Sequence, residues 1–315
     1  MALISVGIPT YNRATTLRRA AGSVLAQTHR ELELVISDNA SSDDTEAVCR
    51  ELCVRDGRVR YLRAPANRGP TANFNRLIDE ARGEFAMLLS DDDWLEPDYL
   101  ERCLETLESE RSASLVAGRA CYIDEQNQER RGALVAIGAS TPGARVLEYL
   151  RAEDTDGLFY GLMRATTLRA AAPIRNSIGN DWLLVAGIVA QGTATTIPDT
   201  AIMRELGGTS ANVKKVVTTL GLPRVQALLP HAVIAWLLFA QILWRGEAFR
   251  LIPAMRRGVL ASRAAFAVLD WRSDAWHATA PTMAAIGRRR GGAPLWRAYL
   301  RLTARLGATH DQLPD

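Results

Sequence analysis

The sequence of 315 residues is poor in several residue types that mark common protein classes. It has four histidines, none in a recognisable site motif, which argues against a zinc site. The four cysteines show no spacing typical of a disulfide framework, so we expect a reducing, cytoplasmic compartment. They are Cys49, Cys53, Cys103 and Cys121.

No apolar run long enough to span a membrane and no signal peptide are visible in the sequence. Residues 232–244 contain one polar residue, Gln241, but as a helix they would reach about 20 Å against a bilayer core of about 30 Å. We expect this segment not to span a membrane. The first three residues lead into an apolar segment with no basic start or cleavage site, so we expect a cytoplasmic protein. The 48% apolar content supports a sizeable core, with room for about two domains.

What the sequence does contain is a run of three carboxylates, Asp91, Asp92 and Asp93, directly after an apolar segment that reads as a buried strand. Like charges at a strand end repel one another, and hard oxygen ligands suit Mg²⁺ or Mn²⁺, usually shared with a substrate phosphate. An acidic loop that caps the next helix, with Pro97 in its first turn, is the alternative interpretation.

Strand-like and helix-like segments alternate through the first 122 residues. Expected strands begin at residue 3 and cover 33–38, 59–63, 85–89 and 114–122. Expected helices follow residue 13, open at Asp43 with Glu46 in capping-box spacing, and cover 70–81 and 97–109. This alternation predicts parallel βαβ units, in which ligands bind at the carboxyl ends of the strands.

Four motifs resemble, in order and spacing, the nucleotide-sugar-dependent family 2 glycosyltransferases of the GT-A fold, which are inverting enzymes. They are IPTYNR at 8–13, SDNASSDDT at 37–45, NRG at 67–69 and LSDDDW at 89–94. The clear resemblance covers about residues 1–110, and a looser one runs to about 215. It implies an α/β protein with a Rossmann-type, mostly parallel sheet flanked by helices.

The resemblance also implies a base pocket. In it Pro9, Tyr11 and Arg13 line the pocket, Asp38 accepts the imino N–H of the base, and Arg68 lies near the base or diphosphate. The residue types agree with these roles, because an aromatic such as Tyr11 offers a stacking face worth roughly 1 to 3 kcal/mol to a base. A carboxylate that accepts from a base N–H favours uracil, thymine or a guanine edge. A tyrosine that covers the sheet edge is the alternative for Tyr11.

By the same resemblance, Asp91 and Asp92 fall where the family's metal-binding motif holds the ribose and the cation, with Asp93 as a third candidate. The implied metal is Mg²⁺ or Mn²⁺, with Asp92 and Asp93 as its ligands and Asp91 on the donor. The family pattern often has an aspartate where this chain has Leu89, so the division of roles among the three carboxylates stays open.

A general base for the acceptor hydroxyl is the remaining requirement of an inverting transfer. The candidate is Asp181, which precedes an apolar run at 183–190 and resembles the family's acidic residue before its acceptor-side helix. A plain helix N-cap is the alternative interpretation. Asp154 and Asp156 are the next candidates, for which a solvated loop is the simpler reading.

A glycine-rich loop at 207–210 is followed by Lys214 and Lys215, the only lysines of the chain. Loop amides and an ammonium group could close over a diphosphate, and a surface turn is an equal alternative. Leu206 stands where many family members have a histidine, so a metal here would depend on carboxylate, diphosphate and water oxygens.

Positive charge is concentrated at the end of the chain. Residues 221–315 contain 13 arginines against 5 acidic residues, whereas the whole chain carries +3. Five of the seven tryptophans lie in the same part. Within it, Arg297, Arg301 and Arg305 share one face of an expected amphipathic helix, and a cluster at 288–290 precedes them. This composition fits an anionic membrane surface, with a packed helical subdomain or oligomer contact as the alternative. Nucleic acid is disfavoured, because the aromatics lie in apolar helices.

The sequence thus predicts a donor-binding half at 1–110, an acceptor-binding half at 111–220 and a helical extension at 221–315. The predicted function is inverting transfer from a UDP-, dTDP- or GDP-type sugar to a hydroxyl of a glycan, a lipid-linked molecule or a small molecule. A cytoplasmic protein, with or without peripheral contact to the inner membrane face, is expected. A non-catalytic sugar-nucleotide sensor is the alternative, whereas a nucleotidyltransferase would be expected to carry a glycine-rich loop after the first strand.

Overall fold

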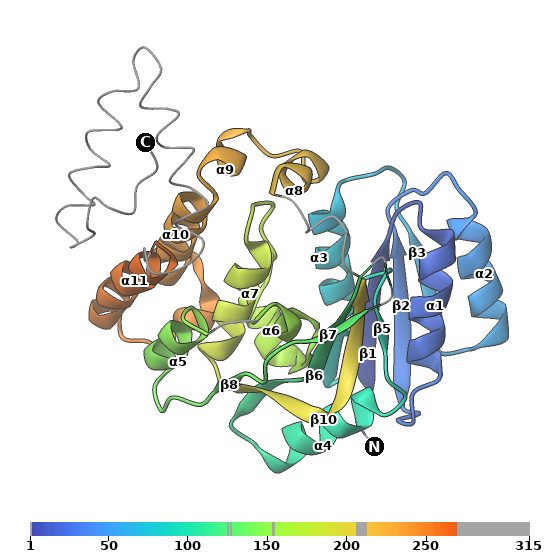
Figure 1. The fold of residues 1–315 in the computed structure, drawn as a ribbon, viewed down its shortest axis with the longest axis horizontal. Helices are drawn as coiled ribbons and strands as arrows, with labels where there is room; N and C mark the ends of the chain where they lie inside the picture. The colour runs from blue at the N-terminus through green and yellow to red at the C-terminus, as the bar shows by residue number, and fades with distance from the viewer. Residues whose placement is uncertain (1, 125, 127, 153–154, 206–212, 270–315) are drawn as a thin grey trace.

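The computed structural model describes residues 2–124, 126, 128–152, 155–205 and 213–269 (Figure 1). Its strands are β1 (Ile4–Thr10), β2 (Leu32–Asp38), β3 (Val59–Arg63), β4 (Phe85–Leu88), β5 (Trp94–Leu95), β6 (Ala113–Ile123), β7 (Glu129–Arg131), β8 (Ala136–Ile137), β9 (Leu162–Arg164) and β10 (Thr193–Glu205). Its helices are α1 (Ala14–Leu25), α2 (Thr45–Arg55), α3 (Pro70–Glu80), α4 (Tyr99–Ser109), α5 (Pro142–Tyr149), α6 (Ala165–Ala171), α7 (Asn180–Val189), α8 (Val213–Thr219), α9 (Val225–Leu228), α10 (Pro230–Ala240) and α11 (Ala254–Val268). Shorter helical turns are η1 (Thr155–Tyr160), η3 (Gln241–Arg245) and η4 (Glu247–Phe249).

The strands form one mixed sheet with the order β3-β2-β1-β4-β9-β6-β10-β5. Strands β3, β2, β1 and β4 are parallel, as the alternation predicts, and β6 and β10 are also parallel. The short β9 runs antiparallel to both β4 and β6, so it joins the two parallel groups into a single sheet. The predicted mostly parallel sheet flanked by helices is therefore confirmed.

Two hydrophobic cores cover the two faces of this sheet. One core contains the buried faces of α1, α2 and α4, and the other contains those of α3, α5, α6, α7, α10 and α11. Alternate residues of each strand enter opposite cores, as in β4, where Phe85 and Met87 face one and Ala86 and Leu88 face the other. In β1 the glycine Gly7 faces α3, where an added Cβ would lie 3.0 Å from Leu77 Cβ. A side chain at position 7 would therefore require Leu77 to move by a few tenths of an ångström.

Two local expectations from the sequence differ from the structure in detail. The predicted helix at 97–109 begins only at Tyr99, and just before it Trp94 and Leu95 form an unpredicted strand with β10. The capping box at the start of α2 does not form, because Glu46 pairs with Arg50 and Arg63. Asp43 still accepts the backbone N–H of Thr45 at 3.0 Å, so it contributes to the helix start.

The apolar segment at 232–244 forms most of α10 and the π-helical turn η3. Over the described residues, no helix combines the length and apolar character needed to cross a membrane. The two tryptophans of the segment are on the surface, with Trp236 60% and Trp244 64% exposed. The basic helix expected around Arg297, Arg301 and Arg305, and the cluster at 288–290, lie outside the described residues.

Candidate functional site

The polar groups singled out from the sequence meet at one edge of the sheet, where β1, β2 and β4 end. Thr10 at the end of β1 lies beside Asp38 at the end of β2, and Leu89, just past β4, donates its N–H to the carbonyl of Gly7. The parallel register, with the contacts of Thr10 and Arg13 to Asp91 and Asp92, therefore places residues 10–13, 38–39 and 91–93 around one edge.

Asp91 and Asp92 form the acidic part of this edge. Thr10 Oγ1 donates to Asp91 Oδ2 at 2.8 Å, and Arg13 Nη1 lies 3.4 Å from Asp92 Oδ2. Burial raises the pKa of Asp91 to about 6; the Thr10 hydrogen bond opposes the shift and the charge of Asp92 adds to it. Both carboxylates are half-buried. A bound cation would reduce the electrostatic repulsion between these two poorly solvated carboxylates.

Asp93 is directed to a different partner. Its side chain is 5% exposed and its Oδ2 lies 3.5 Å from Nε of Arg204, which is 13% exposed. Burial raises the pKa of Asp93 to about 7, while Arg204 opposes the shift. The Arg204 guanidinium also lies 4.6 Å from the ring centre of Tyr160 and 5.5 Å from that of Tyr122. This buried ion pair fastens the acidic loop to β10.

The sequence argument missed Arg204 as part of the site. Arg204 follows Met203, which pairs with Trp94 in the antiparallel β5–β10 ladder. This pairing brings the end of β10 to the acidic loop. It could not be predicted, because a strand of two residues is too short to show a periodic pattern in the sequence. Arg19 is a second missed contact, since its Nη2 donates to the carbonyl of Asp92 at 2.8 Å and its guanidinium stacks 3.8 Å from the Trp94 ring centre.

The side chains available as metal ligands at this edge fit a hard divalent cation only in part. Across the ranges that the structure describes, no three His, Cys, Asp or Glu side chains converge in a way that would hold a metal by themselves. Asp91 and Asp92 offer the oxygen atoms that Mg²⁺ and Mn²⁺ prefer, and such ions commonly complete their shell with substrate phosphate and water. The predicted role of Asp93 as a ligand stays a prediction, since its carboxylate faces Arg204.

Pro9 and Tyr11, expected to line a nucleobase pocket, lie on either side of Thr10 in the sequence. Tyr11 is 44% exposed and Pro9 is half-buried at the end of β1. Asn12 has a positive φ of 54°, and its Oδ1 accepts the backbone N–H of Ser42 at 2.8 Å. This contact ties the 11–13 turn to the loop after β2, and leaves the Tyr11 ring accessible to a base.

Asp38 is more enclosed than its expected role suggests. Its side chain is fully buried, and its oxygens accept from the Ser41 backbone N–H at 2.8 Å and from the Tyr61 hydroxyl at 2.7 Å. Burial and the hydrogen bond to Asp38 both raise the pKa of Tyr61. Each carboxylate oxygen has a further lone pair and can accept one more hydrogen bond. The contact of Asp38 with a nucleobase stays a prediction.

The Arg68 loop is held against the same edge by amide side chains. Asn39 Oδ1 accepts the backbone N–H of Arg68 at 3.0 Å, and Asn39 Nδ2 donates to Asn67 Oδ1 at 2.8 Å. Gly69 has a φ of 81°, which favours glycine, and α3 begins directly after it at Pro70. The side chain of Arg68 is exposed to solvent and does not belong to either hydrophobic core.

Asp181 lies in the first turn of α7, after a left-handed Gly179 with a φ of 66°. The N-cap residue is Gly179, so the interpretation of Asp181 as a plain N-cap is wrong. Burial raises the pKa of the Tyr160 hydroxyl, and Arg204 opposes the shift. The carboxylates of Asp92, Asp93 and Asp181 add to it. The charges of both the acidic loop and Asp181 therefore act on the Tyr160 hydroxyl.

The other expected groups contribute less. Asp154 and the 207–210 loop lie outside the described residues, and Asp156 lies in η1. Lys214 and Lys215 are exposed at the start of α8.

Residues 5–166 match the family model described as "Glycosyl transferase family 2". Among curated proteins, the chain is 29% identical over 221 residues to a hyaluronan synthase of Pasteurella multocida and 30% identical over 219 residues to a chondroitin synthase of Escherichia coli. Each match covers 68% of this chain but only 21% and 30%, respectively, of those relatives. The chain therefore spans less than a third of the length of either relative.

Solved structures show the same fold. S. aureus TarS 1–349 in complex with UDP-GlcNAc superimposes with a TM-score of 0.59 at 13% identity, over 90% of this chain and 80% of that one. The mannosyltransferase PcManGT from Pyrobaculum calidifontis, in complex with GDP-Man and Mn²⁺, gives 0.51 at 17% identity, over 98% and 87%. At these identities the likeness establishes the fold alone.

Proposed function

The chain belongs to glycosyl transferase family 2, and from this premise we propose that it transfers a sugar, with inversion, from a nucleoside diphosphate sugar to an acceptor hydroxyl. The observation that carries the proposal is the position of Asp91 and Asp92 at the carboxyl edge of β1 and β4, where Thr10 and Arg13 contact them. An inverting transfer also needs a general base that approaches the sugar from the face opposite the leaving diphosphate.

On the donor side, we assign the base to the Tyr11 and Asp38 region and the ribose to Asp91. Tyr11 offers an exposed ring for stacking on the nucleobase, and Arg13 of the same turn lies 3.4 Å from Asp92. Arg68 on its anchored loop supplies a positive charge near the base or diphosphate. Residues 1–110 would form the donor half and residues 111–220 the acceptor half. TarS and PcManGT, which share the fold, are described in complex with UDP-GlcNAc and with GDP-Man, which supports a nucleotide-sugar donor.

Asp92, assisted by Asp91 and by donor oxygens, would hold Mg²⁺ or Mn²⁺. The chemistry that such an ion supplies is Lewis-acid stabilisation of the leaving diphosphate. The protein's own contribution is to keep both carboxylates directed to one edge through Thr10 and Arg13. Arg204 neutralises Asp93 within the protein, so the acidic loop carries less repulsion than three free carboxylates would.

On the acceptor side, Asp181 would take the proton from the attacking hydroxyl. It lies in the first turn of α7, and a carboxylate is a group that can accept a proton in general-base catalysis. The alternative from the sequence is a binding protein without activity. Such a protein would need the residues that bind the nucleotide sugar but no general base.

A donor screen tests the proposal. We expect UDP, dTDP or GDP, together with Mn²⁺ or Mg²⁺, to raise the melting temperature of the full chain, because a ligand that binds only the native state stabilises it by mass action. ADP and CDP should raise it less, because Asp38 accepts but cannot donate. Release of nucleoside diphosphate from the corresponding sugar donor, measured with mixed acceptors, separates an enzyme from a sensor. Stabilisation by none of these nucleotides would contradict the proposal.

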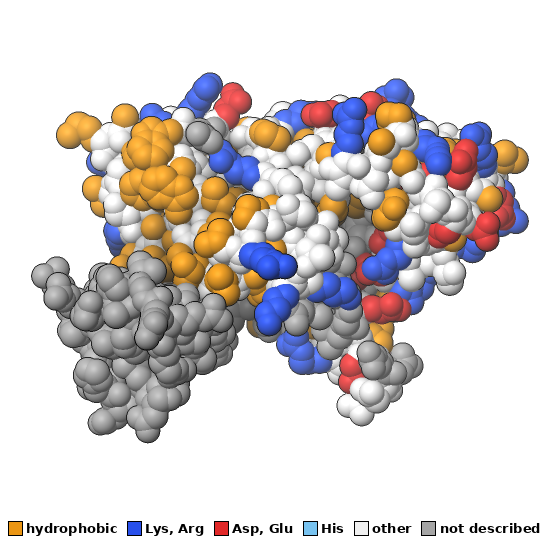
Figure 2. Space-filling view, turned by 90° about the horizontal axis from the view of Figure 1, so that it is seen from above, with side chains coloured by type: hydrophobic (Ala, Val, Ile, Leu, Met, Phe, Trp, Pro, Cys, Tyr) orange, Lys and Arg blue, Asp and Glu red, His pale blue; other side chains and the backbone are white. Residues whose placement is uncertain are grey.

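We also propose peripheral contact of residues 221–315 with anionic membranes. Trp236 and Phe239 stack with ring centres 6.0 Å apart, and Phe239 meets Trp244 edge to face at 5.8 Å. Figure 2 shows hydrophobic side chains gathered over the end of the molecule formed by the C-terminal helices. Exposed tryptophans of this kind favour a membrane interface. Their exposure also argues against the packing alternative, which predicts a large loss of stability on their truncation.

Joint substitution Trp236→Ala and Trp244→Ala should therefore weaken sedimentation with anionic vesicles and change the melting temperature little. The parent protein should not sediment with neutral vesicles, and salt should weaken its attachment. Val54→Ala, which removes an exposed apolar side chain on α2, is the matched control and should bind as the parent does. A parent protein that ignores anionic vesicles at low salt would refute the membrane contact.

A further inference from the structure

The segment that follows the acidic loop lies along α1 and is hydrogen-bonded to it. Ser23 Oγ accepts the backbone N–H of Leu95 at 3.2 Å. Gln27, two residues past the end of α1, donates from Nε2 to the carbonyl of Glu96 at 2.7 Å, and its Oε1 accepts the backbone N–H of Leu100 at 2.9 Å. Gln27 is fully buried, so these bonds are shielded from water. The segment is therefore held in register against α1.

Arg19 extends this attachment into the acidic loop itself. It stands four residues before Ser23, so the two side chains share one face of α1. Its Nη2 donates to the backbone carbonyl of Asp92 at 2.8 Å, and its Nη1 lies 2.7 Å from Oε1 of Glu205 at the end of β10. The guanidinium also lies 3.8 Å from the ring centre of Trp94. One planar group thus joins α1, the acidic loop, β5 and β10.

These three contacts define the position of the guanidinium, although the Arg19 side chain is 39% exposed. A single ion pair at a surface contributes little, because solvent screens it and both side chains lose freedom. Here the planar fork of an arginine meets a carbonyl, a carboxylate and an aromatic face from one orientation, so little freedom is lost for each contact formed. Arg19 is therefore suited to hold the backbone of Asp92 in place.

Asp92 is contacted at two points by two arginines. Arg13, the N-cap residue of α1, lies 3.4 Å from its carboxylate, and Arg19 binds its carbonyl. A metal ion that binds the carboxylate competes with Arg13 for the same group. The bond from Arg19 to the carbonyl, by contrast, leaves the carboxylate available. The Arg19 contact can therefore persist while Asp92 binds a metal ion.

We propose that Arg19 is a positioning residue for Asp92, and that it fixes the backbone of the acidic loop so that the Asp92 carboxylate meets a divalent cation on the donor diphosphate. The inference rests on the proposed function, since it uses the role of Asp92 as a metal ligand. Glu205 and Trp94 act through Arg19, because they hold its guanidinium against the carbonyl of Asp92. Removing a group that orients a metal ligand commonly lowers metal affinity by a factor of roughly 10 to 100.

The charge of Arg19 by itself predicts the opposite result. A positive group near a metal site repels the cation, so its removal should strengthen metal binding if charge alone matters. Loss of positioning should weaken metal binding instead. The direction of the change in Arg19→Gln therefore separates the two effects.

Calorimetric titration of the full chain with UDP, GDP or dTDP, at a series of Mn²⁺ concentrations, is the test. The quantity measured is the Mn²⁺ concentration that gives half of the increase in nucleotide affinity, which we call the half-effect concentration. Arg19→Gln should raise it by about tenfold or more. Arg19→Lys keeps the charge and one donor group, so it should recover part of this loss. If Arg19→Gln does not fold, Arg19→Lys serves, since an ammonium group cannot make all three contacts and the half-effect concentration should still rise.

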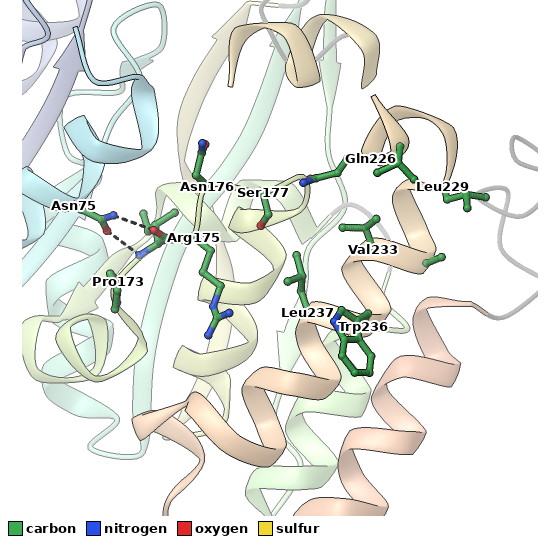
Figure 3. Close-up of a pocket in the computed structure, with 13 residues that line it drawn as sticks. Asn75, Pro173, Arg175, Asn176, Ser177, Gln226, Leu229, Val233, Trp236 and Leu237 are labelled. Carbon is green, nitrogen blue, oxygen red and sulfur yellow. Dashed lines mark hydrogen bonds between the residues drawn. The ribbon is translucent and has the colours of Figure 1, made fainter. Parts of the chain in front are cut away.

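Arg18→Gln is the matched control. Arg18 is the preceding residue of α1, and it pairs with Glu51 of α2 at 2.7 Å. The substitution removes the same charge from the same helix and should leave the half-effect concentration close to that of the parent protein. A second control lies in the cleft of about 660 Å³ between residues 173–177 and the helices α9 and α10 (Figure 3). Val225→Ala changes the lining of this cleft, which includes none of the residues that contact Arg19, and should have no effect.

Combined substitutions show whether the groups act on one another. Arg19→Gln should add little to the loss in Asp92→Asn, because both changes act on the same metal ligand. Glu205→Gln should raise the half-effect concentration by less than Arg19→Gln does, and should add little to it in the combined variant. The melting temperature without ligand measures any structural cost separately. An unchanged or lower half-effect concentration in the folded Arg19 variants would overturn the inference, and so would equal increases in Arg19→Gln and Arg18→Gln.

The parent protein tests the proposed function separately. If it binds none of UDP, dTDP and GDP, the proposed function is overturned and this inference with it. If Mn²⁺ does not affect nucleotide binding by the parent, Asp92 is not a metal ligand and Arg19 has nothing to position. If Asp92→Asn abolishes most of the Mn²⁺ effect while Arg19→Gln changes nothing, the positioning role alone is overturned.

Discussion

Asp181→Asn should lower the rate of sugar transfer by about 10²- to 10⁴-fold and leave donor binding close to that of the parent protein. General-base catalysis typically contributes a factor of this size, and an amide cannot take the proton from an acceptor hydroxyl. Donor contacts, by contrast, are assigned to the edge formed by β1, β2 and β4. The measurement is kcat for nucleoside diphosphate release with acceptor present, together with the melting-temperature shift that the donor nucleotide produces.

The fold should survive this change, because asparagine is nearly isosteric with aspartate and the N-cap of α7 is the backbone of Gly179. Asp79→Asn on the exposed face of α3 is the matched control, with the same loss of charge and no expected change in rate. Near-normal turnover in folded Asp181→Asn would remove Asp181 from the mechanism and direct attention to Asp156 and Asp154.

Asp92→Asn should abolish most of the contribution of Mn²⁺ to nucleotide binding and lower turnover by a factor of roughly 10² or more, since the metal's stabilisation of the leaving group is worth several kcal/mol. The substitution keeps the side-chain volume and removes one formal charge from a group that is 18% exposed. Calorimetric titration of UDP, GDP or dTDP, with and without Mn²⁺, measures the effect independently of activity. Metal-free binding should change little, because the base contacts are elsewhere.

The loss of the Asp92 charge has a second expected consequence. That charge is one cause of the raised pKa of Asp91, so the pKa of Asp91 should fall in Asp92→Asn and its carboxylate should ionise at lower pH. Asp44→Asn, at an exposed position in the loop before α2, is the control and should leave the Mn²⁺ effect intact. Full metal-dependent binding and turnover in Asp92→Asn would show that the metal, if one is used, is held by other groups.

The sequence alone predicted the first half of the molecule well. Strand β3 has the predicted bounds, and α3 and β4 differ from theirs by one residue at one end. The reason is that residues near in sequence determine βαβ units, through the periods of apolar residues in strands and helices. Once the strands are parallel, their carboxyl ends must share an edge, and so Tyr11, Asp38 and Asp91 could be grouped from the sequence.

Tertiary structure alone decided which partner each of these side chains has. Asp93 faces Arg204 because a two-residue strand pairs with β10, and Asp38 is enclosed because the Tyr61 hydroxyl reaches it from β3. Ser177 lines a cleft because α9 and α10 pack against its loop. Such contacts join segments far apart in the chain, and they depend on strand register and helix packing. Neither leaves a periodic pattern in the sequence, because each is set by how completed elements fit together.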